Sequence, residues 1–122
     1  MKYYLFAIND DFYNDFKNKP KVIYDMLNRI RVIGNDYGVS VYKQICSNIN
    51  TDLINNYLNK KFYSTYKSNK HIINNNVIAV RPSCIMVVGY SGFPPFLKYL
   101  NFYNKKFFVC NFEKNNYFWL YS

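Results

Sequence analysis

The first third of the chain shows a hydrophobic pattern that predicts one strand followed by two helices. Residues 3–8 are aromatic or aliphatic throughout, which is typical of a buried strand. The Asn-Asp-Asp run at 9–11 offers N-cap candidates and acidic residues for a first helical turn, and apolar residues at helical spacing continue to Phe16. A second amphipathic helix is expected over 20–33, opened by a proline and ended by Gly34.

The middle of the chain has a weaker pattern. Residues 35–40 are polar and contain a glycine, so a loop is expected there, and 42–45 fit either a short helix or an extended piece. Thr51 and Asp52 are expected to cap a further helix with its apolar face between 53 and 58. Residues 62–66 either finish this helix or alternate as a strand. The Asn run at 74–76 predicts a turn, because Asn tolerates the left-handed backbone.

The last third of the chain predicts two hairpins with a helix between them. The β-branched runs at 77–80 and 84–90 are joined by Arg-Pro-Ser, which indicates a first hairpin. A proline then opens a helix over 95–103. Residues 107–112 and 117–121 flank a polar turn and predict the second hairpin.

Taken together, the elements predict a single α+β domain over residues 1–122. Their expected order is β-α-α-α-β-β-α-β-β, with about five strands in a mostly antiparallel sheet and the helices packed on it. A chain of 122 residues with 50% hydrophobic residues can bury a sizeable core without disulfides or metals, which excludes intrinsic disorder.

The cysteine and hydropathy patterns favour a cytoplasmic protein. No apolar run approaches the roughly 18 residues that a membrane span needs. The N-terminal apolar run is followed at once by acidic residues and has no small-residue cleavage site, so a signal peptide is not expected. The three cysteines are odd in number and widely spaced, as expected of reduced thiols: Cys46, Cys84 and Cys110.

The net charge of +9 has two possible explanations. The first is selection for nucleic-acid binding, because a basic surface attracts phosphate groups. However, 19 Asn and 13 Lys against 3 Arg and 2 Ala indicate a low-GC bacterial genome, which raises the lysine content without selection for phosphate binding. The basic residues are also scattered, with no block of five. A solvated surface is therefore favoured, and a small basic nucleic-acid-binding protein stays open as the alternative function.

The sequence offers no residue set that supports catalysis, and we expect no enzyme activity, cofactor or metal. His71 is the only histidine, and a lone histidine is more often a surface or hydrogen-bonded structural residue than a base. Asp10 and Asp11 are adjacent, which suits a helix start rather than a catalytic pair, and Glu113 falls in a hairpin turn. Thiols within apolar strands stay protonated, and neither phosphate-loop motif is present.

Several short motifs, read in order, resemble one known family. No single motif is specific to the family, and the resemblance rests on the order and spacing of all of them. They are Tyr3-Tyr4, Asp10-Asp11-Phe12, Phe16, Lys43-Gln44-Ile45, the strand 84–90, the helix 96–103, the strand 107–112 and Tyr117-Phe118-Trp119-Leu120. The chain thereby resembles the sporulation inhibitor of replication family, SirA, and would form a single SirA-like domain.

The resemblance implies a protein-binding inhibitor rather than an enzyme. Members of this family look like small inhibitors that bind the N-terminal domain of the replication initiator DnaA and block initiation of replication during sporulation. Carried over by position, the implied partner-binding residues are Phe12, Phe16 and Gln44, together with Asp11 and Lys43. Spacing at i and i+4 places both Phe rings on one helix face. That face meets either a partner or the protein's own core; in the first case, Tyr13 could take the core position instead.

Overall fold

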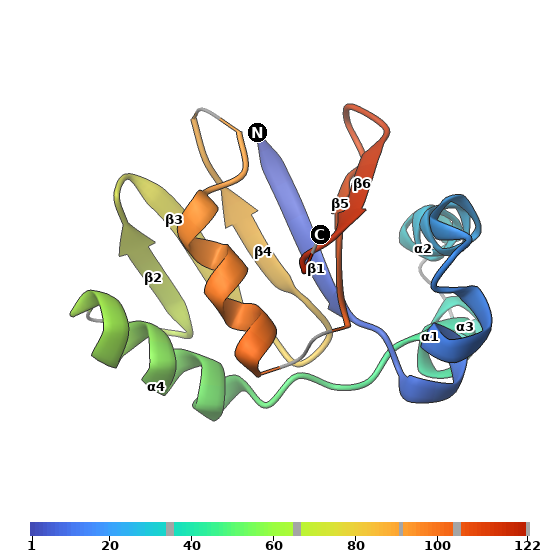
Figure 1. Cartoon of the computed structure of the whole chain (residues 1–122), viewed down its shortest axis with the longest axis horizontal. Coiled ribbons are helices and arrows are strands. Elements are labelled where there is room, and N and C mark those ends of the chain that lie inside the picture. Colours follow the sequence, from blue (N-terminus) through green and yellow to red (C-terminus); the bar gives the residue numbers. More distant parts are fainter. Residues whose placement is uncertain (34–35, 65–66, 91, 104–105, 122) are drawn as a thin grey trace.

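A six-stranded antiparallel sheet is the centre of the computed structural model, which describes residues 1–33, 36–64, 67–90, 92–103 and 106–121 (Figure 1). The strands lie in the order β2-β3-β4-β1-β5-β6, and every neighbouring pair is antiparallel. Their bounds are β1 (Lys2–Ala7), β2 (Lys70–Ile73), β3 (Asn76–Val80), β4 (Ile85–Val88), β5 (Phe107–Asn111) and β6 (Asn116–Trp119).

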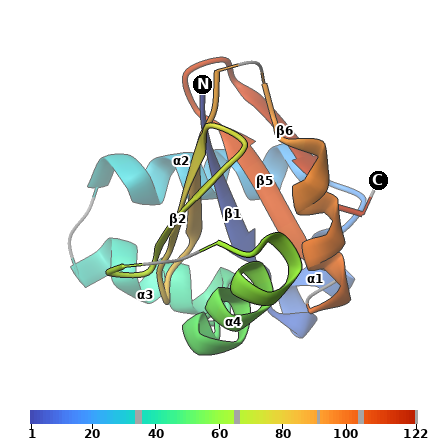
Figure 2. The same cartoon turned by 90° about the vertical axis from the view of Figure 1, so that its left-hand side faces the viewer.

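Helices pack on both faces of this sheet, so the predicted α+β class is confirmed. Figure 2 shows α2 and α3 on one side of the strands and α4 and η1 on the other. The helices are α1 (Asp10–Phe16), α2 (Pro20–Ile33), α3 (Asp36–Ile45), α4 (Thr51–Phe62) and the 3₁₀ helix η1 (Pro95–Phe102). None of the helices within the described ranges has the length and hydropathy needed to cross a membrane.

The first core lies between the sheet and the pair α4 and η1. The strand register places His71, Ile78, Val87 and Tyr3 in one row across four strands, and all four side chains are buried. Leu97 and Leu100 of η1, with Ile54 and Leu58 of α4, close over this face. Alternate residues of each strand therefore supply this core, as the two-residue period of a strand requires.

The second core lies on the opposite face, over β1, β5 and β6. Phe6, Phe108 and Trp119 form one row in the register, and α2 packs Ile23 and Leu27 against them. Figure 1 shows α1, α2 and α3 gathered at the β6 end of the sheet. The proposed partner-binding residues of α1 and α3 are therefore placed at this end of the molecule.

Most of the predicted hairpins, caps and turns are confirmed. The hairpins β3–β4 and β5–β6 pair antiparallel. Asn9 is the N-cap of α1, where its side-chain oxygen accepts a hydrogen bond from the backbone N–H of Phe12 at 2.8 Å. Asn74 and Asn75 have φ of 50° and 65° and form the two-residue turn between β2 and β3. Positive φ at both turn residues is the geometry that a tight hairpin favours.

The loop expected over 35–40 is wrong where the structure describes it. Helix α3 runs from Asp36 through the ambiguous 42–45 segment to Ile45. Gly38 is buried within it and faces Ile30 of α2, at a distance that a methyl group would meet as an ordinary contact. Packing of α3 against α2 therefore outweighs the low helix propensity of glycine. Gly34 and Asn35, expected to end α2 and begin the loop, lie outside the described residues.

The stretch from the start of α4 to β3 differs from the prediction in two ways, at the N-cap of α4 and at His71. Helix α4 ends at Phe62, and Tyr63 follows it in the left-handed conformation, while the remainder of 62–66 lies partly outside the described residues. The N-cap of α4 is Asn50, not Thr51 or Asp52. His71 belongs to a sixth strand, β2, and not to a loop, because its alternation of exposed and buried residues was hidden among asparagines.

Candidate protein-binding site

Asn9 joins the start of α1 to the end of α3. Its side-chain oxygen caps α1, and its side-chain Nδ2 donates to the backbone oxygen of Gln44 at 2.6 Å. Its own backbone N–H donates to the carbonyl oxygen of Ile45 at 2.9 Å. One residue thereby fixes the two segments that carry the candidate residues next to each other.

The inner side of α1 is fixed by aromatic residues at the end of β6 and just after it. The Tyr13 ring packs edge to face on Trp119, with 5.0 Å between ring centroids, and its hydroxyl is hydrogen bonded to that of Tyr121. The Trp119 indole N–H donates to the carbonyl oxygen of Lys17, the C-cap residue of α1, at 3.1 Å. Lys106 forms an ion pair with Asp10 at the other end of the helix. Tyr13 is therefore half-buried against Trp119, as Phe12 and Phe16 are against the same core, and α1 places no side chain fully in it.

Phe12 and Phe16 form a stacked pair on α1. Their ring centroids lie 4.5 Å apart and their planes differ by 22°. Both rings are half-buried against the second core, and α1 contains no fully buried residue. The rings therefore contact the core on one side and present an aromatic surface to solvent on the other, and contact with a partner stays a prediction.

The remaining candidate residues are exposed around this pair. Asp11 lies in the first turn of α1, and Lys43 and Gln44 lie in the last turn of α3, with all three side chains exposed. Asp11 and Phe12, at the start of α1, thus lie near the end of α3 that carries Lys43 and Gln44, and Phe16 is the last residue of the seven-residue α1. An aromatic patch bordered by amide and charged groups is typical of the centre and rim of a protein interface.

An apolar cavity of about 610 Å³ begins beside Lys43, between α2 and α3. Ile30, Val39 and Cys46 line it, together with Tyr42, whose hydroxyl donates to the backbone oxygen of Ser83 at 2.8 Å. Sequence analysis missed this cavity because it assigned the first half of α3 to a loop. Recognition of Val39 and Tyr42 as one helix face would have indicated it.

A buried polar cluster around His71 also contains residue types that occur in catalytic sites. Ser64 Oγ lies 2.7 Å from His71 Nδ1, and Asn55 Oδ1 lies 2.8 Å from His71 Nε2. Asn55 also donates to Asn69 Oδ1 at 2.8 Å. Because Asn55 accepts at Nε2, that nitrogen carries the ring proton and Nδ1 accepts from the serine. Burial lowers the pKa of His71, so the ring is neutral in the folded protein.

This cluster of hydrogen-bonded side chains has a structural role. Ser64, His71 and Asn55 are each less than 10% exposed, and together they tie the end of α4 to β2. Within the described residues, no buried side-chain nitrogen or oxygen lacks a hydrogen-bond partner. The histidine thus fits the hydrogen-bonded structural role expected of a lone histidine.

The cysteines are buried, as the sequence predicted. Burial raises the pKa of Cys46, Cys84 and Cys110, so the protonated thiol is favoured in each. Across the described part of the chain, no three His, Cys, Asp or Glu side chains are placed to hold a metal ion.

Comparison of the chain with protein-family models and with curated proteins gives no match.

Proposed function

We propose that the protein binds the N-terminal domain of the replication initiator DnaA in the cytoplasm and thereby inhibits initiation of chromosome replication, in connection with sporulation. The contact surface consists of Phe12 and Phe16 at its centre, with Gln44, Asp11 and Lys43 around them. The proposal rests on the resemblance of the ordered motifs to the SirA family. It rests equally on the half-exposed aromatic rings of this surface and on the exposed polar side chains around them.

The stacked pair of phenylalanine rings carries the proposal. Two half-exposed aromatic rings on a helix whose other side is tied to Trp119 present a rigid apolar anchor. Such anchors lose little conformational entropy on binding and are common at the energetic centre of interfaces. The exposed Gln44 amide offers both a donor and an acceptor to a partner's backbone.

Calorimetric titration of the protein into the isolated DnaA N-terminal domain of its host tests the proposal. We expect saturable binding of one protein per domain at physiological salt. Phe12→Ala should weaken it by more than about 2 kcal/mol, the threshold of a hot-spot residue. Gln44→Ala should weaken it by a smaller amount, near the value of one hydrogen bond, about 1 kcal/mol.

Phe102→Ala is the control, because Phe102 is 80% exposed on η1, which packs on the first core, whereas α1 packs on the second. It should bind the DnaA domain like the wild type. Absence of binding by a wild-type protein with a normal unfolding transition, or equal losses from Phe12→Ala and Phe102→Ala, would contradict the proposal.

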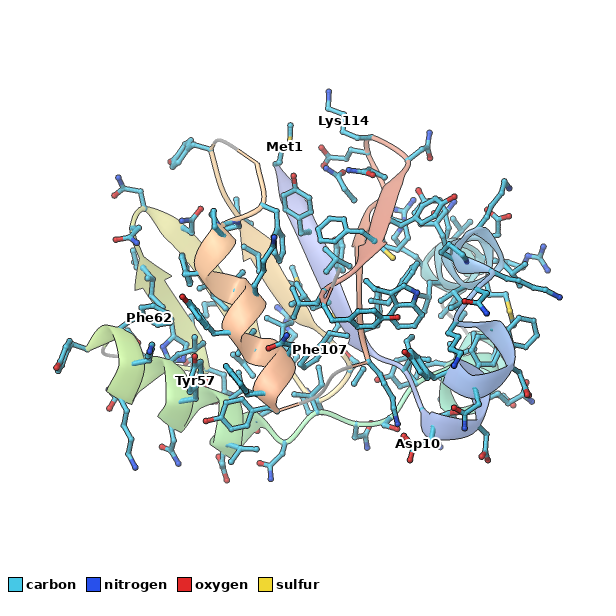
Figure 3. The ribbon with its side chains drawn as sticks, viewed as in Figure 1. Met1, Asp10, Tyr57, Phe62, Phe107 and Lys114 are labelled. Atoms are coloured by element: carbon cyan, nitrogen blue, oxygen red, sulfur yellow. The ribbon has the colours of Figure 1, made fainter. Side chains whose placement is uncertain are left out.

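Direct nucleic-acid binding is a second candidate function, favoured by the surface formed by α4 and η1. Tyr63, Tyr99 and Phe102 are 91%, 50% and 80% exposed there. Lys61 Nζ lies 5.3 Å from the ring centroid of Tyr99, and Lys98 precedes it on η1. Exposed aromatic rings among lysines suit the stacking of unpaired bases. In Figure 3, Tyr57 and Phe62 mark this surface, at the opposite end of the molecule from Asp10.

Salt dependence separates the two functions. If the second candidate holds, random single-stranded oligonucleotides bind with an affinity that falls steeply as salt rises. Phe102→Ala should then reduce that affinity, and Phe12→Ala should leave it unchanged. If the DnaA proposal holds, Phe12→Ala reduces the affinity for the DnaA domain and Phe102→Ala leaves that affinity unchanged.

A further inference from the structure

Half of one sheet face carries an exposed row of apolar side chains. The register places Ile72 of β2, Val77 of β3 and Val88 of β4 directly opposite one another. They are 73%, 38% and 46% exposed, and Met86 of β4 is only half-buried beside them. Directly opposed residues lie within about 5.5 Å, so the three side chains form one continuous surface rather than scattered contacts.

This exposed face is the reverse side of a fully packed core. The alternate residues of the same strands, His71, Ile78 and Val87, are buried under α4 and η1. On the exposed side, the helices α1, α2 and α3 are gathered at the β6 end of the sheet, where they cover β1, β5 and β6 and leave β2 and β3 uncovered (Figure 1). Strands with two apolar faces are typical of sheets that are covered on both sides.

A cavity borders the exposed row where the sheet meets α2. It has a volume of about 230 Å³ and is lined mainly by apolar side chains. Tyr4, which pairs with Met86 in the register, connects it to the exposed row. Leu27 and Ile30 of α2, Cys84 and Phe112 form other parts of its wall. A cavity of roughly 150 Å³ holds a benzene ring, so this one has room for a bulky apolar side chain.

Cationic side chains surround the row and the cavity. Arg31 lines the cavity with its guanidinium 4.8 Å from the Phe112 ring centroid, and Lys2 Nζ lies 5.5 Å from that of Tyr4. Burial raises the pKa of the Cys84 thiol in the cavity wall, and the positive charges of Arg81 and Lys2 act against this rise. Lys70, exposed on β2, pairs with Ala79 on the same face. None of the described residues that line the cavity carries a carboxylate.

We propose that this face of β2, β3 and β4 binds an acidic amphipathic helix of a partner protein. Three strands span roughly 10 Å between their outer axes, which matches the diameter of a helix, about 10–12 Å. The helix would place its apolar side on the row of Ile72, Val77 and Val88 and one bulky side chain in the cavity. Its carboxylates would face Lys2, Arg31 and Lys70. A second copy of this basic chain would bring like charges together, which disfavours self-association through the same face.

This inference is independent of the proposed DnaA contact, because the two surfaces share no residue. Selection of helical peptides from a random displayed library on the immobilised full chain tests it. We expect enriched peptides to carry apolar residues at i, i+3 or i+4, and i+7, with Asp and Glu on both flanks. The best peptide, labelled and titrated by fluorescence anisotropy, should bind more weakly as salt increases.

Charge-adding variants on the exposed row, with a control of matched exposure on α4, locate the binding site. Val88→Glu should weaken binding of the selected peptide at least tenfold, and Ile72→Glu provides a second test at a more exposed position. Leu53→Glu on α4, where the wild-type side chain is 45% exposed against 46% for Val88, adds the same charge and should change the affinity less than twofold. Phe12→Ala should also change it less than twofold.

Three results would overturn the proposal. The first is the enrichment of no peptide, or of peptides without the acidic amphipathic pattern. The second is equal binding of the selected peptide to the wild type and to both Val88→Glu and Ile72→Glu. The third is a wild-type dimer in sedimentation analysis that Val88→Glu dissociates, which would show that a second copy covers this face.

Discussion

At the scale of single residues, His71 is a buried base whose charge state is tied to folding. The neutral ring accepts from Ser64 and donates to Asn55 within the core side of β2. Burial lowers its pKa below 6.5 in the folded protein. The unfolded chain retains the ordinary pKa. As the pH falls below this ordinary pKa, the unfolded chain therefore binds a proton that the folded chain does not bind.

We therefore predict that the free energy of unfolding decreases as the pH is lowered from 7.5 to 5.5. The stabilisation is complete above the ordinary pKa and is lost as the pH falls toward the folded pKa. One proton limits the slope to about 1.4 kcal/mol per pH unit. Urea unfolding at several pH values measures it. In His71→Gln this part of the slope should disappear, and an identical slope in both proteins would contradict the assignment.

The sequence could predict which candidate side chains share a helix face, but not how deeply each side chain is buried. Phe12 and Phe16 at i and i+4 predicted a shared helix face, and the rings are indeed stacked. How much of each ring faces solvent depends on Tyr13 and Trp119, which are more than a hundred residues apart in the chain. For His71, the asparagines around it concealed a strand, because their turn propensity dominated the local pattern.

At the scale of elements, α1 is a seven-residue helix that depends on its contacts at both ends. Isolated helices of this length are not stable in water. The Asn9 cap, the Asn9–Gln44 hydrogen bond and the Trp119 hydrogen bond to Lys17 supply the missing stability. The position of the phenylalanine pair relative to Gln44 is therefore set by Asn9.

Asn9→Ala should reduce the free energy of unfolding by about 1–2 kcal/mol, the value of an N-cap, and should also weaken binding to the DnaA domain. Asn50→Ala is the matched control, because Asn50 caps α4 in the same way through the backbone N–H of Leu53. It should have a similar cost in stability and leave the affinity unchanged. Chemical denaturation and calorimetry measure the two quantities. Equal affinity losses in both variants would count against a specific role for Asn9.

Elements with strong local patterns were predicted correctly, and those set by tertiary packing were not. The β3–β4 and β5–β6 hairpins and the Asn9 cap follow from turn and capping chemistry within a few residues. Helix α3 instead contains Gly38, and its stability comes from burial against α2. Strand β2 is only four residues long and carries one polar and one apolar side chain on each face, so it is defined by its pairing with β3.

At the scale of the whole molecule, the surface charge is unevenly distributed. The net charge is +9, yet α1 carries Asp10, Asp11 and Asp15, whereas Lys60 and Lys61 lie in the last turn of α4. A basic protein attracts an acidic partner over distances comparable to the Debye length, about 8 Å at physiological salt. This attraction acts on the rate of association more than on the lifetime of the complex.

We predict that, with a DnaA domain of net negative charge, the association rate constant falls as salt increases, while the dissociation rate constant stays nearly constant. Stopped-flow fluorescence over a range of salt concentrations measures both. The Lys60→Gln, Lys61→Gln double variant is the control: it removes two charges at the end of the molecule opposite α1, where salt screens their effect on the contact, and should leave both rate constants nearly unchanged. An association rate that is independent of salt would exclude steering by the net charge.

The central claim is that the ends of α1 and α3 form the surface that contacts the DnaA N-terminal domain. Nuclear magnetic resonance of the isotope-labelled protein, titrated with the unlabelled domain, tests it most directly. We expect the largest shift changes at Asp11, Phe12, Phe16, Lys43 and Gln44, and small changes along η1 and over β2 and β3. Saturable changes centred on η1 or on the exposed face of β2, β3 and β4, or no changes at all, would contradict it.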